Sequence, residues 1–450
     1  MRHILKIPIW LGVTSLLING SPLRGESLGL SEAVQRALNQ NPLVRATAAG
    51  GEASRAGLKE ARSGRLPSVD FSGTYAHSNN PVFVFGSLLE QGRFSESNFD
   101  PAYLNHPGAL SNFRSSLDLR IPIFNRFQVS SQIEKAQIQE GQASADTAWV
   151  QQQIRFEVIH TYYGVLVAEA RKEVAREAVK SAEAEVKRIR DRFDQGFVVE
   201  SDLLAMEVQL ADFRQQLVQA EGEERTARAA LNTVLAQPIA TPEILGGQLE
   251  DRRFSVPPQA ELVQLALDNR PDYKRSKMDI QLARQDLKSS KGQYWPDLNV
   301  FGQLGHSTQS FANGSGDFAV GARLTFKLLD FGRGARTDQL SAASEAARAQ
   351  EQHKANQIQF EVVKAYQSFL TSQEKLNVAA SAVQQAEEAL RIVNDRHGVG
   401  LTTITEVLRS QTALLRARLN LLAARYDYYL GFAQTLLASG LLTDVTKLAS

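Results

Sequence analysis

The sequence predicts a mainly α-helical fold that carries a few β-strands and is built from two structural repeats. Landmarks of the first half return in the second half, short segments alternate apolar and polar residues, and two long stretches keep heptad spacing. A length of 450 residues permits either several ordinary domains or one repeat architecture, so the duplication decides between them. We expect a first repeat over 26–250 and a second over 251–450.

The N-terminus has the layout of a secretory signal peptide. Basic residues at positions 2 and 6 precede an apolar run from Ile7 to Ile18, and small residues follow it. The alternative is a membrane anchor, but a helix needs about 20 apolar residues to cross a bilayer and this run is shorter. No later segment has an apolar run of that length. We therefore expect removal of residues 1–25 and export of the rest.

Composition argues against several classes of protein. The 50 basic and 49 acidic residues leave a net charge of +1, which gives no electrostatic reason to expect a nucleic-acid partner. The absence of cysteine excludes disulfides, thiolate metal sites and cysteine nucleophiles. The 7 histidines are scattered, and no H-E-x-x-H, G-x-S-x-G or phosphate-loop motif occurs. We expect no enzyme, no catalytic residue, no cofactor and no metal.

The duplication is visible as pairs of landmarks. Two early pairs are separated by 229 residues and two later pairs by 205 and 204. The pairs are Pro42 and Pro271, Pro67 and Pro296, the segments that begin at Leu119 and Leu324, and the glycine-containing segments 192–204 and 396–408. The change of offset means that the first repeat carries 24 extra residues, and they fall between its two alternating segments.

Four segments alternate with the period of a strand, at about 68–77, 113–124, 297–306 and 318–329. In the first of them Phe71 and Tyr75 oppose Asp70 and Thr74. Strands of this length with one apolar face suit a tilted transmembrane strand, and the alternative is a soluble sheet packed on its own helices. Both strand pairs lie at the same end of a predicted rod that offers no other core, which favours the membrane.

Four strands cannot close a barrel. The smallest membrane barrels have eight strands and are filled with side chains, so an open pore requires at least a trimer with 12 strands. The polar strand faces would then line the lumen. The lumen residues that we expect are Asp118, Arg120, Arg323 and Lys327.

The remaining sequence is predicted to be helical. A row of mostly apolar residues runs from Ile358 to Val393 with spacing 4,3,4,3, and a matching row begins at Ile154. This period indicates left-handed coiled-coil packing. The helices that carry the rows, about 126–192 and 331–396, would each be about 100 Å long at 1.5 Å per residue. The segments 192–204 and 396–408 are predicted to be hairpin tips that join antiparallel helices.

These features together resemble the TolC family of outer-membrane efflux channels. The opening LSEAVQRALNQNP, the proline-led strands, the exits LRIPIFN and LTFKLLDFG, and the R-x-x-x-G tips occur in the family's order, twice. The resemblance covers the mature chain. It implies a homotrimer in outer-membrane lipid with a 12-stranded barrel and an α-helical periplasmic tunnel. It also implies a passive conduit that docks onto a periplasmic adaptor (membrane fusion) protein and an inner-membrane pump.

The resemblance assigns roles to residues at the tips. Residues that would receive the adaptor are Arg192, Phe193, Gly196, Arg396 and Gly400. Asp202 and Glu406 would form a gate at the pore entrance; alternatively they only interact with the dipole of a helix N-terminus, an effect of about 0.3 to 1 kcal/mol. Arg409 stands where a second acidic residue would strengthen such a gate.

A periplasmic coiled-coil scaffold or adaptor without a barrel is the alternative function. It accounts for the heptads and tips, but it accounts neither for two pairs of two-faced strands nor for the duplication. The long loop of the first repeat would be extracellular, and it either folds over the pore or packs on neighbouring subunits. The sequence leaves the exported substrate open among drugs, metal ions and polypeptides.

Overall fold

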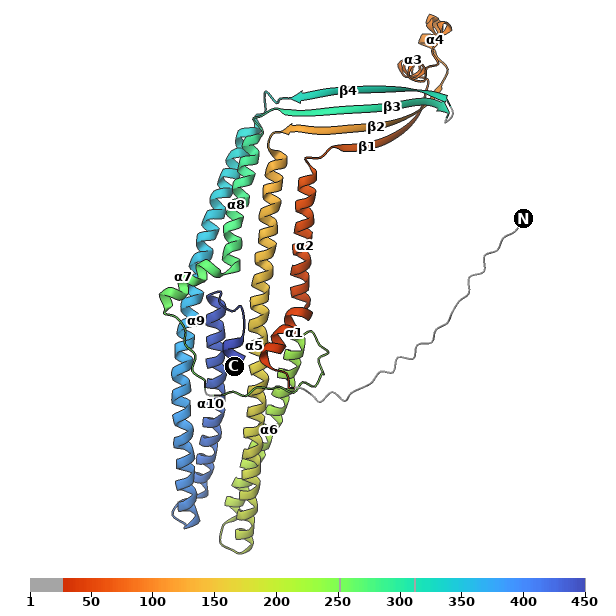
Figure 1. Ribbon diagram of the computed structural model, residues 1–450. Helices are drawn as coiled ribbons and strands as arrows, with labels where there is room; N and C mark the ends of the chain where they lie inside the picture. The colour runs from red at the N-terminus through yellow and green to blue at the C-terminus, as the bar shows by residue number, and fades with distance from the viewer. Residues whose placement is uncertain (1–26, 251, 311–312, 450) are drawn as a thin grey trace, which may run out of the picture.

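The computed structural model describes residues 27–250, 252–310 and 313–449. Figure 1 shows a long helical rod with a four-stranded sheet at one end and two hairpin tips at the other. The predicted signal peptide lies outside the described residues. Among the described residues, no helix combines the length and the apolar character needed to cross a bilayer.

The two repeats form matching sets of four helices, whose lengths of 11, 22, 67 and 35 residues are the same in both. The first set is α1 (Leu30–Gln40), α2 (Pro42–Ser63), α5 (Gln128–Asp194) and α6 (Glu200–Val234). The second set is α7 (Gln259–Asn269), α8 (Pro271–Gly292), α9 (Gly332–Gly398) and α10 (Ile404–Ala438), and a short α11 (Thr446–Ala449) ends the described chain. At 1.5 Å per residue, α5 and α9 each extend about 100 Å.

The sheet is antiparallel throughout, in the order β1-β2-β3-β4. Its strands are β1 (Ser68–Ser78), β2 (Leu110–Asn125), β3 (Asp297–Ser310) and β4 (Asn313–Thr325). Each overlaps a predicted strand. The expected strands at 297–306 and 318–329 leave residues 307–317 between them as a loop, and this was wrong, because β3 and β4 continue into those residues. The glycine, serine and threonine residues there are polar or small on both faces, so they hide the alternation.

The predicted end of the last strand at 329 was also wrong. β4 ends at Thr325, and Lys327 lies beyond it, in the connection to α9. There the backbone carbonyl of Lys327 accepts a hydrogen bond from Arg333 Nη2 at 2.9 Å, and Asp330 Oδ1 accepts one from Gly332 N at 3.1 Å. These bonds begin the helix, so the chain has left the ladder although its apolar alternation continues.

The strand register gives the sheet two unlike faces. Rows such as Val69, Leu119, Gly302 and Val320 lie across all four strands on one face. Large apolar side chains of this face are exposed to solvent within a single chain: Val69, Phe71, Tyr75, Leu117, Leu119, Leu304, Phe318, Val320 and Leu324. The other face carries mostly polar and charged residues. An isolated chain therefore has an apolar sheet face without a partner.

The helical core follows the predicted heptad rows. In α5 nearly the whole row from Ile154 to Ile189 is buried, whereas in α9 it is buried from Ile358 to Ser372 and half-buried from there to the tip. The difference follows from position. α5 packs against helices of both repeats, namely α1, α2, α6, α8 and α10, whereas α9 packs against α7, α8 and α10.

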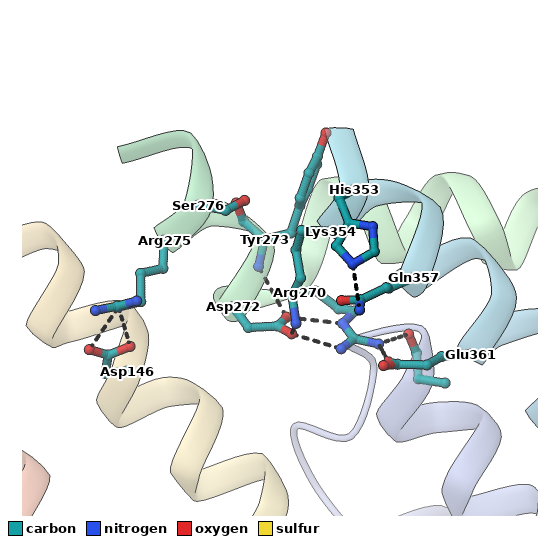
Figure 2. Close-up of polar contacts among 11 residues, drawn as sticks. Asp146, Arg270, Asp272, Tyr273, Arg275, Ser276, His353, Lys354, Gln357 and Glu361 are labelled. Atoms are coloured by element: carbon teal, nitrogen blue, oxygen red, sulfur yellow. Dashed lines mark hydrogen bonds and ion pairs between the residues drawn. The ribbon is translucent and has the colours of Figure 1, made fainter. Parts of the chain in front are cut away.

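A buried charged network joins helices at the middle of the rod, where α7 meets α8 (Figure 2). The Arg270 side chain is only 2% exposed. Figure 2 shows its guanidinium between two carboxylates: Nη2 lies 2.7 Å from Asp272 Oδ2, and Nη1 lies 2.6 Å from Glu361 Oε2. Nη1 also donates to the carbonyl of Ala438 at 3.2 Å, and the guanidinium lies 4.8 Å from the ring centroid of Trp149.

The network sets the ionisation of Asp272. Burial alone would raise the pKa of this carboxyl group, because a charge is poorly solvated inside the protein. The hydrogen bonds from Arg270 and from Lys354, whose Nζ lies 2.8 Å from Asp272 Oδ2, outweigh burial and hold the pKa below its ordinary value. Asp272 is therefore an ionised member of the network at neutral pH.

Candidate functional site: the hairpin tips and the two faces of the sheet

The two tips have the same backbone geometry. Gly196 and Gly400 both have φ of 76°. Gly196 N donates to Phe193 O at 2.8 Å, and the next residue, Phe197, donates to Arg192 O at 2.9 Å. The same two bonds recur in the second tip at 3.0 and 2.8 Å. This pattern ends a helix with a left-handed residue, a position that glycine occupies without strain.

The predicted docking residues lie together at the end of the rod opposite the sheet (Figure 1). Arg192 and Phe193 are half-buried, whereas Gly196, Arg396 and Gly400 are exposed. A Cβ added to either glycine would meet nothing within 4 Å. The requirement for glycine at the tips is therefore conformational, and open space surrounds both turns.

Four apolar residues at the tips were missed in the sequence. Phe197 is 71% exposed and Leu401, its equivalent 204 residues later, is 68% exposed. Val199 and Val399 are exposed to a similar degree. A residue that follows a left-handed glycine usually packs back onto its own helix, but these side chains stay in solvent. The signal was present as apolar residues in GFVV and VGL, in turns where polar residues are the rule.

Asp202 and Glu406 each lie in the first turn of a returning helix, α6 and α10. Glu406 forms an ion pair with Arg409, with 3.0 Å between its Oε1 and Arg409 Nη1. Asp202 is half-buried, and its backbone N–H donates to Val199 O at 3.1 Å. The positions suit an interaction with the helix dipole, and the pairing of Glu406 reduces the negative charge that a gate would use.

Three of the four predicted lumen residues lie in the sheet on its polar face. Asp118 Oδ1 accepts a hydrogen bond from Gln303 Nε2 at 2.7 Å across β2 and β3. Arg120 lies opposite Phe301, and the guanidinium of Arg323 lies 5.6 Å from the centroid of the same ring. The fourth residue, Lys327, lies beyond β4. The described residues include no group of three or more acidic and histidine side chains placed to hold a metal ion.

The rod of paired helices, the two tips and the two-faced sheet define the class of protein as a channel of the outer membrane with a helical extension. A profile of the outer membrane efflux protein family matches residues 33–237 and 262–438, and the chain belongs to this family. The chain is 22% identical to the alkaline protease secretion protein AprF of Pseudomonas aeruginosa over 425 residues, which cover 93% of this chain and 85% of that protein.

Two further similarities support the assignment. Outer membrane protein TolC of Escherichia coli is 23% identical over 468 residues, which cover 98% of this chain and 88% of that protein. The CmeC outer membrane channel of Campylobacter jejuni superposes with a TM-score of 0.79 over 98% of this chain and 95% of that chain, at 16% identity. The predicted TolC-like fold, outer-membrane location and export function are confirmed, and the alternative of a scaffold gains no support.

Proposed function

We propose that three copies of this chain together form one channel, whose strands close into a barrel. The channel conducts solutes passively from the periplasm to the exterior. The observation that carries this proposal is the sheet, whose apolar face is exposed and whose outer strands, β1 and β4, each have one unpaired edge. Three four-stranded sheets joined edge to edge give 12 strands with an apolar exterior and a polar lumen. Asp118, Arg120 and Arg323 then face water.

The helical rods continue this pore as a tunnel through the periplasm. The exposed apolar residues of α9, such as Phe360 and Val378, support close packing against a neighbouring copy. In this proposal the channel is passive, and the energy for export comes from partners, an inner-membrane pump and a periplasmic adaptor.

The assembly is tested in outer-membrane extracts. We expect the full chain to fractionate with the outer membrane, to migrate as a trimer in unheated gels, and to open ion-conducting pores in planar lipid bilayers. Recovery of a monomer in the soluble periplasm would contradict the proposal. The scaffold alternative predicts that result.

The adaptor is proposed to dock at the tips. The two turns have the same shape, so each chain offers two similar sites. Their residues are Arg192, Phe193 and Gly196 in the first tip and Arg396 and Gly400 in the second. Phe197 and Leu401 add exposed apolar area to the first and second site, respectively. Apolar side chains held in solvent by a rigid turn are typical of interaction sites. We therefore expect the adaptor to bind these side chains in an apolar groove.

Substitutions at the tips test the docking proposal. Replacing Gly196 and Gly400 with valine should abolish export while the trimer stays inserted, because a β-branched residue resists φ of 76°. F197S together with L401S should weaken adaptor capture without straining the backbone. The matched control is E200Q, which changes an exposed charge in the first turn of α6. Unchanged export in the double valine variant would contradict docking at the tips.

Asp202 and Glu406 remain candidates for a gate at the entrance. If the two carboxylates form a gate, the double variant D202N with E406Q should raise the conductance of isolated channels. If they only interact with the helix dipoles, the conductance should stay unchanged and the protein should lose about 0.3 to 1 kcal/mol of free energy of unfolding per residue. Planar-bilayer recordings with the paired residue Arg409 left intact separate the two readings.

A further inference from the structure

The long loop of the first repeat is a folded unit. It contains α3 (Pro81–Glu90), a 3-10 turn η1 (Glu96–Phe99) and α4 (Pro101–Asn105), at the end of the sheet farthest from the helical rod (Figure 1). Val84 and Leu88 are buried against Leu110 of β2. Phe94 packs edge-on against Phe85 and Phe99, with 5.0 Å between ring centroids in each pair. The equivalent connection between β3 and β4 contains only residues 311–312.

Polar contacts anchor this unit to the sheet. Gln91 is 4% exposed, and its Nε2 donates to Ser111 O at 3.0 Å and to Asn112 Oδ1 at 2.9 Å. Glu90 Oε2 accepts a hydrogen bond from Ser307 Oγ at 3.2 Å and lies 3.3 Å from Arg114 Nη1. The unit is thus tied to β2 and β3 by the buried Gln91 and by the more exposed Glu90, and these several anchors favour one fixed position.

The anchors also show which face of the sheet the unit covers. Asn112 and Arg114 lie six and four residues before Asp118, which are even offsets, so they belong to the same polar face. Arg114 Nη1 lies 2.9 Å from Asp317 Oδ2 of β4, and this residue pairs with Gly305 on the same face. A Cβ added to Gly92 would lie 3.4 Å from the Cβ of Ser315, a further residue of the polar face. These side-chain contacts with β2, β3 and β4 therefore lie on the side opposite the exposed apolar rows.

We propose that residues 79–109 form a fixed plug on the lumen side of the barrel and narrow its outward mouth. The proposal rests on the trimeric barrel described above, in which the polar face surrounds the pore, so three plugs meet around the axis. Each plug exposes large apolar side chains, with Val82 81% and Phe99 63% exposed, beside the exposed charged residues Arg93, Glu96 and Asp100. The plugs therefore limit the size of the solutes that can leave through the mouth.

Removal of the plug tests the constriction. The variant replaces residues 79–109 with Asn-Gly, so that a two-residue hairpin turn joins the paired residues Ser78 of β1 and Leu110 of β2. Trimers of this variant, inserted in planar lipid bilayers, should show about a twofold higher single-channel conductance than wild type, because the narrowest outward section is removed. The control is E261Q, an exposed change in the first turn of α7, outside the plug, which should leave conductance unchanged. Equal conductance of plug-deleted and wild-type trimers would overturn the proposal.

A disulfide tests the position of the plug in the native membrane. The chain has no cysteine, so G92C with S315C introduces the only pair, at a Cβ separation that suits a disulfide. We expect rapid oxidation in outer-membrane trimers, seen as a shift in unheated, non-reduced gels, with no change of conductance on reduction. The control pair G108C with S315C should stay reduced, because Gly108 has no neighbour within 4 Å.

Failure to oxidise in G92C with S315C would place the loop elsewhere and overturn the plug. A conductance that rises on reduction would show that the bond pulls an otherwise open loop inward, and this result would also overturn it. Failure of wild type to form trimers or pores would instead overturn the proposed channel assembly. The two failures are therefore distinguishable in the same preparations.

Discussion

In each repeat, a side chain just before a proline donates a hydrogen bond to the carbonyl group of the last residue of a long helix, but the side chain differs between the repeats. Asn41 and Arg270 each precede the proline that begins a 22-residue helix, α2 or α8. Asn41 Nδ2 donates to the carbonyl of Val234 at 3.0 Å, and Arg270 Nη1 donates to the carbonyl of Ala438 at 3.2 Å. Those carbonyls belong to the last residues of α6 and α10, which are equivalent positions.

The side chains differ in what else they require. Asn41 Oδ1 accepts from Leu43 N at 2.9 Å, so one neutral amide caps α2 and holds α6. A guanidinium has no acceptor and cannot cap a helix. In the second repeat Asp272 takes that role by accepting from Tyr273 N at 3.0 Å, and with Glu361 it neutralises the buried arginine. The first contact thus depends on a neutral amide, whereas the equivalent contact in the second repeat depends on a network of charged side chains.

The largest expected effect is that of R270A. Removal of the guanidinium leaves Asp272 buried beside Lys354 alone, and breaking a buried ion pair costs about 3 to 5 kcal/mol. Guanidinium unfolding followed by the fluorescence of Trp149, which lies against Arg270, measures the loss of free energy of unfolding. The control is R275A, whose partner Asp146 is exposed and 2.9 Å away (Figure 2), and it should cost less than about 1 kcal/mol.

A double substitution should convert the second junction to the chemistry of the first. R270N with D272L places asparagine and leucine where the first repeat has Asn41 and Leu43. The new asparagine can cap α8, and no buried charge is left without a partner. We expect recovery of about half or more of the stability lost in R270A. R270N alone should not recover it, and equal stabilities of the single and double variants would show that Asp272 is not the source of the loss.

Acid should weaken the second junction selectively. The pKa of Asp272 is lowered in the folded protein, so its contribution is fully present above the ordinary carboxyl pKa and is lost as the pH falls through the folded pKa. We expect the midpoint of unfolding of wild type to decline below about pH 4 more steeply than that of the R270N with D272L variant. Parallel pH profiles of the two proteins would contradict an ionised Asp272.

The smallest effect is expected at the first junction. N41A removes one cap and one hydrogen bond but leaves no buried charge, so it should cost about 1 to 2 kcal/mol. The same unfolding experiment measures it. The variant N41D separates the two contributions, because it keeps the helix cap but loses the side-chain donor to Val234 O. A loss in N41A as large as that in R270A would mean that the charged network adds nothing to the second junction.

Repetition made most of this fold predictable from sequence. The offset of 204 residues located both tips, and the left-handed glycines lie where the pattern indicated. The Arg270 network was not predictable, because positions 41 and 270 share no side-chain chemistry and its partner Glu361 lies 91 residues away. The helices of the long loop were not predicted from the sequence, for a different reason. Both helices are short, and α3 is mostly apolar on every side, so neither shows a helical period. The position of the unit depends on contacts with distant strands.

Equal helix lengths also impose a constraint on change. Each residue of an α-helix adds 1.5 Å of rise and about 100° of rotation. A single deletion in α9, without one in α5, would raise its tip by about 1.5 Å and turn the following side chains to a different neighbour. Length variation is therefore expected in whole heptads and in both repeats together, whereas the loop between β1 and β2, which no matched helix depends on, is free to vary in length.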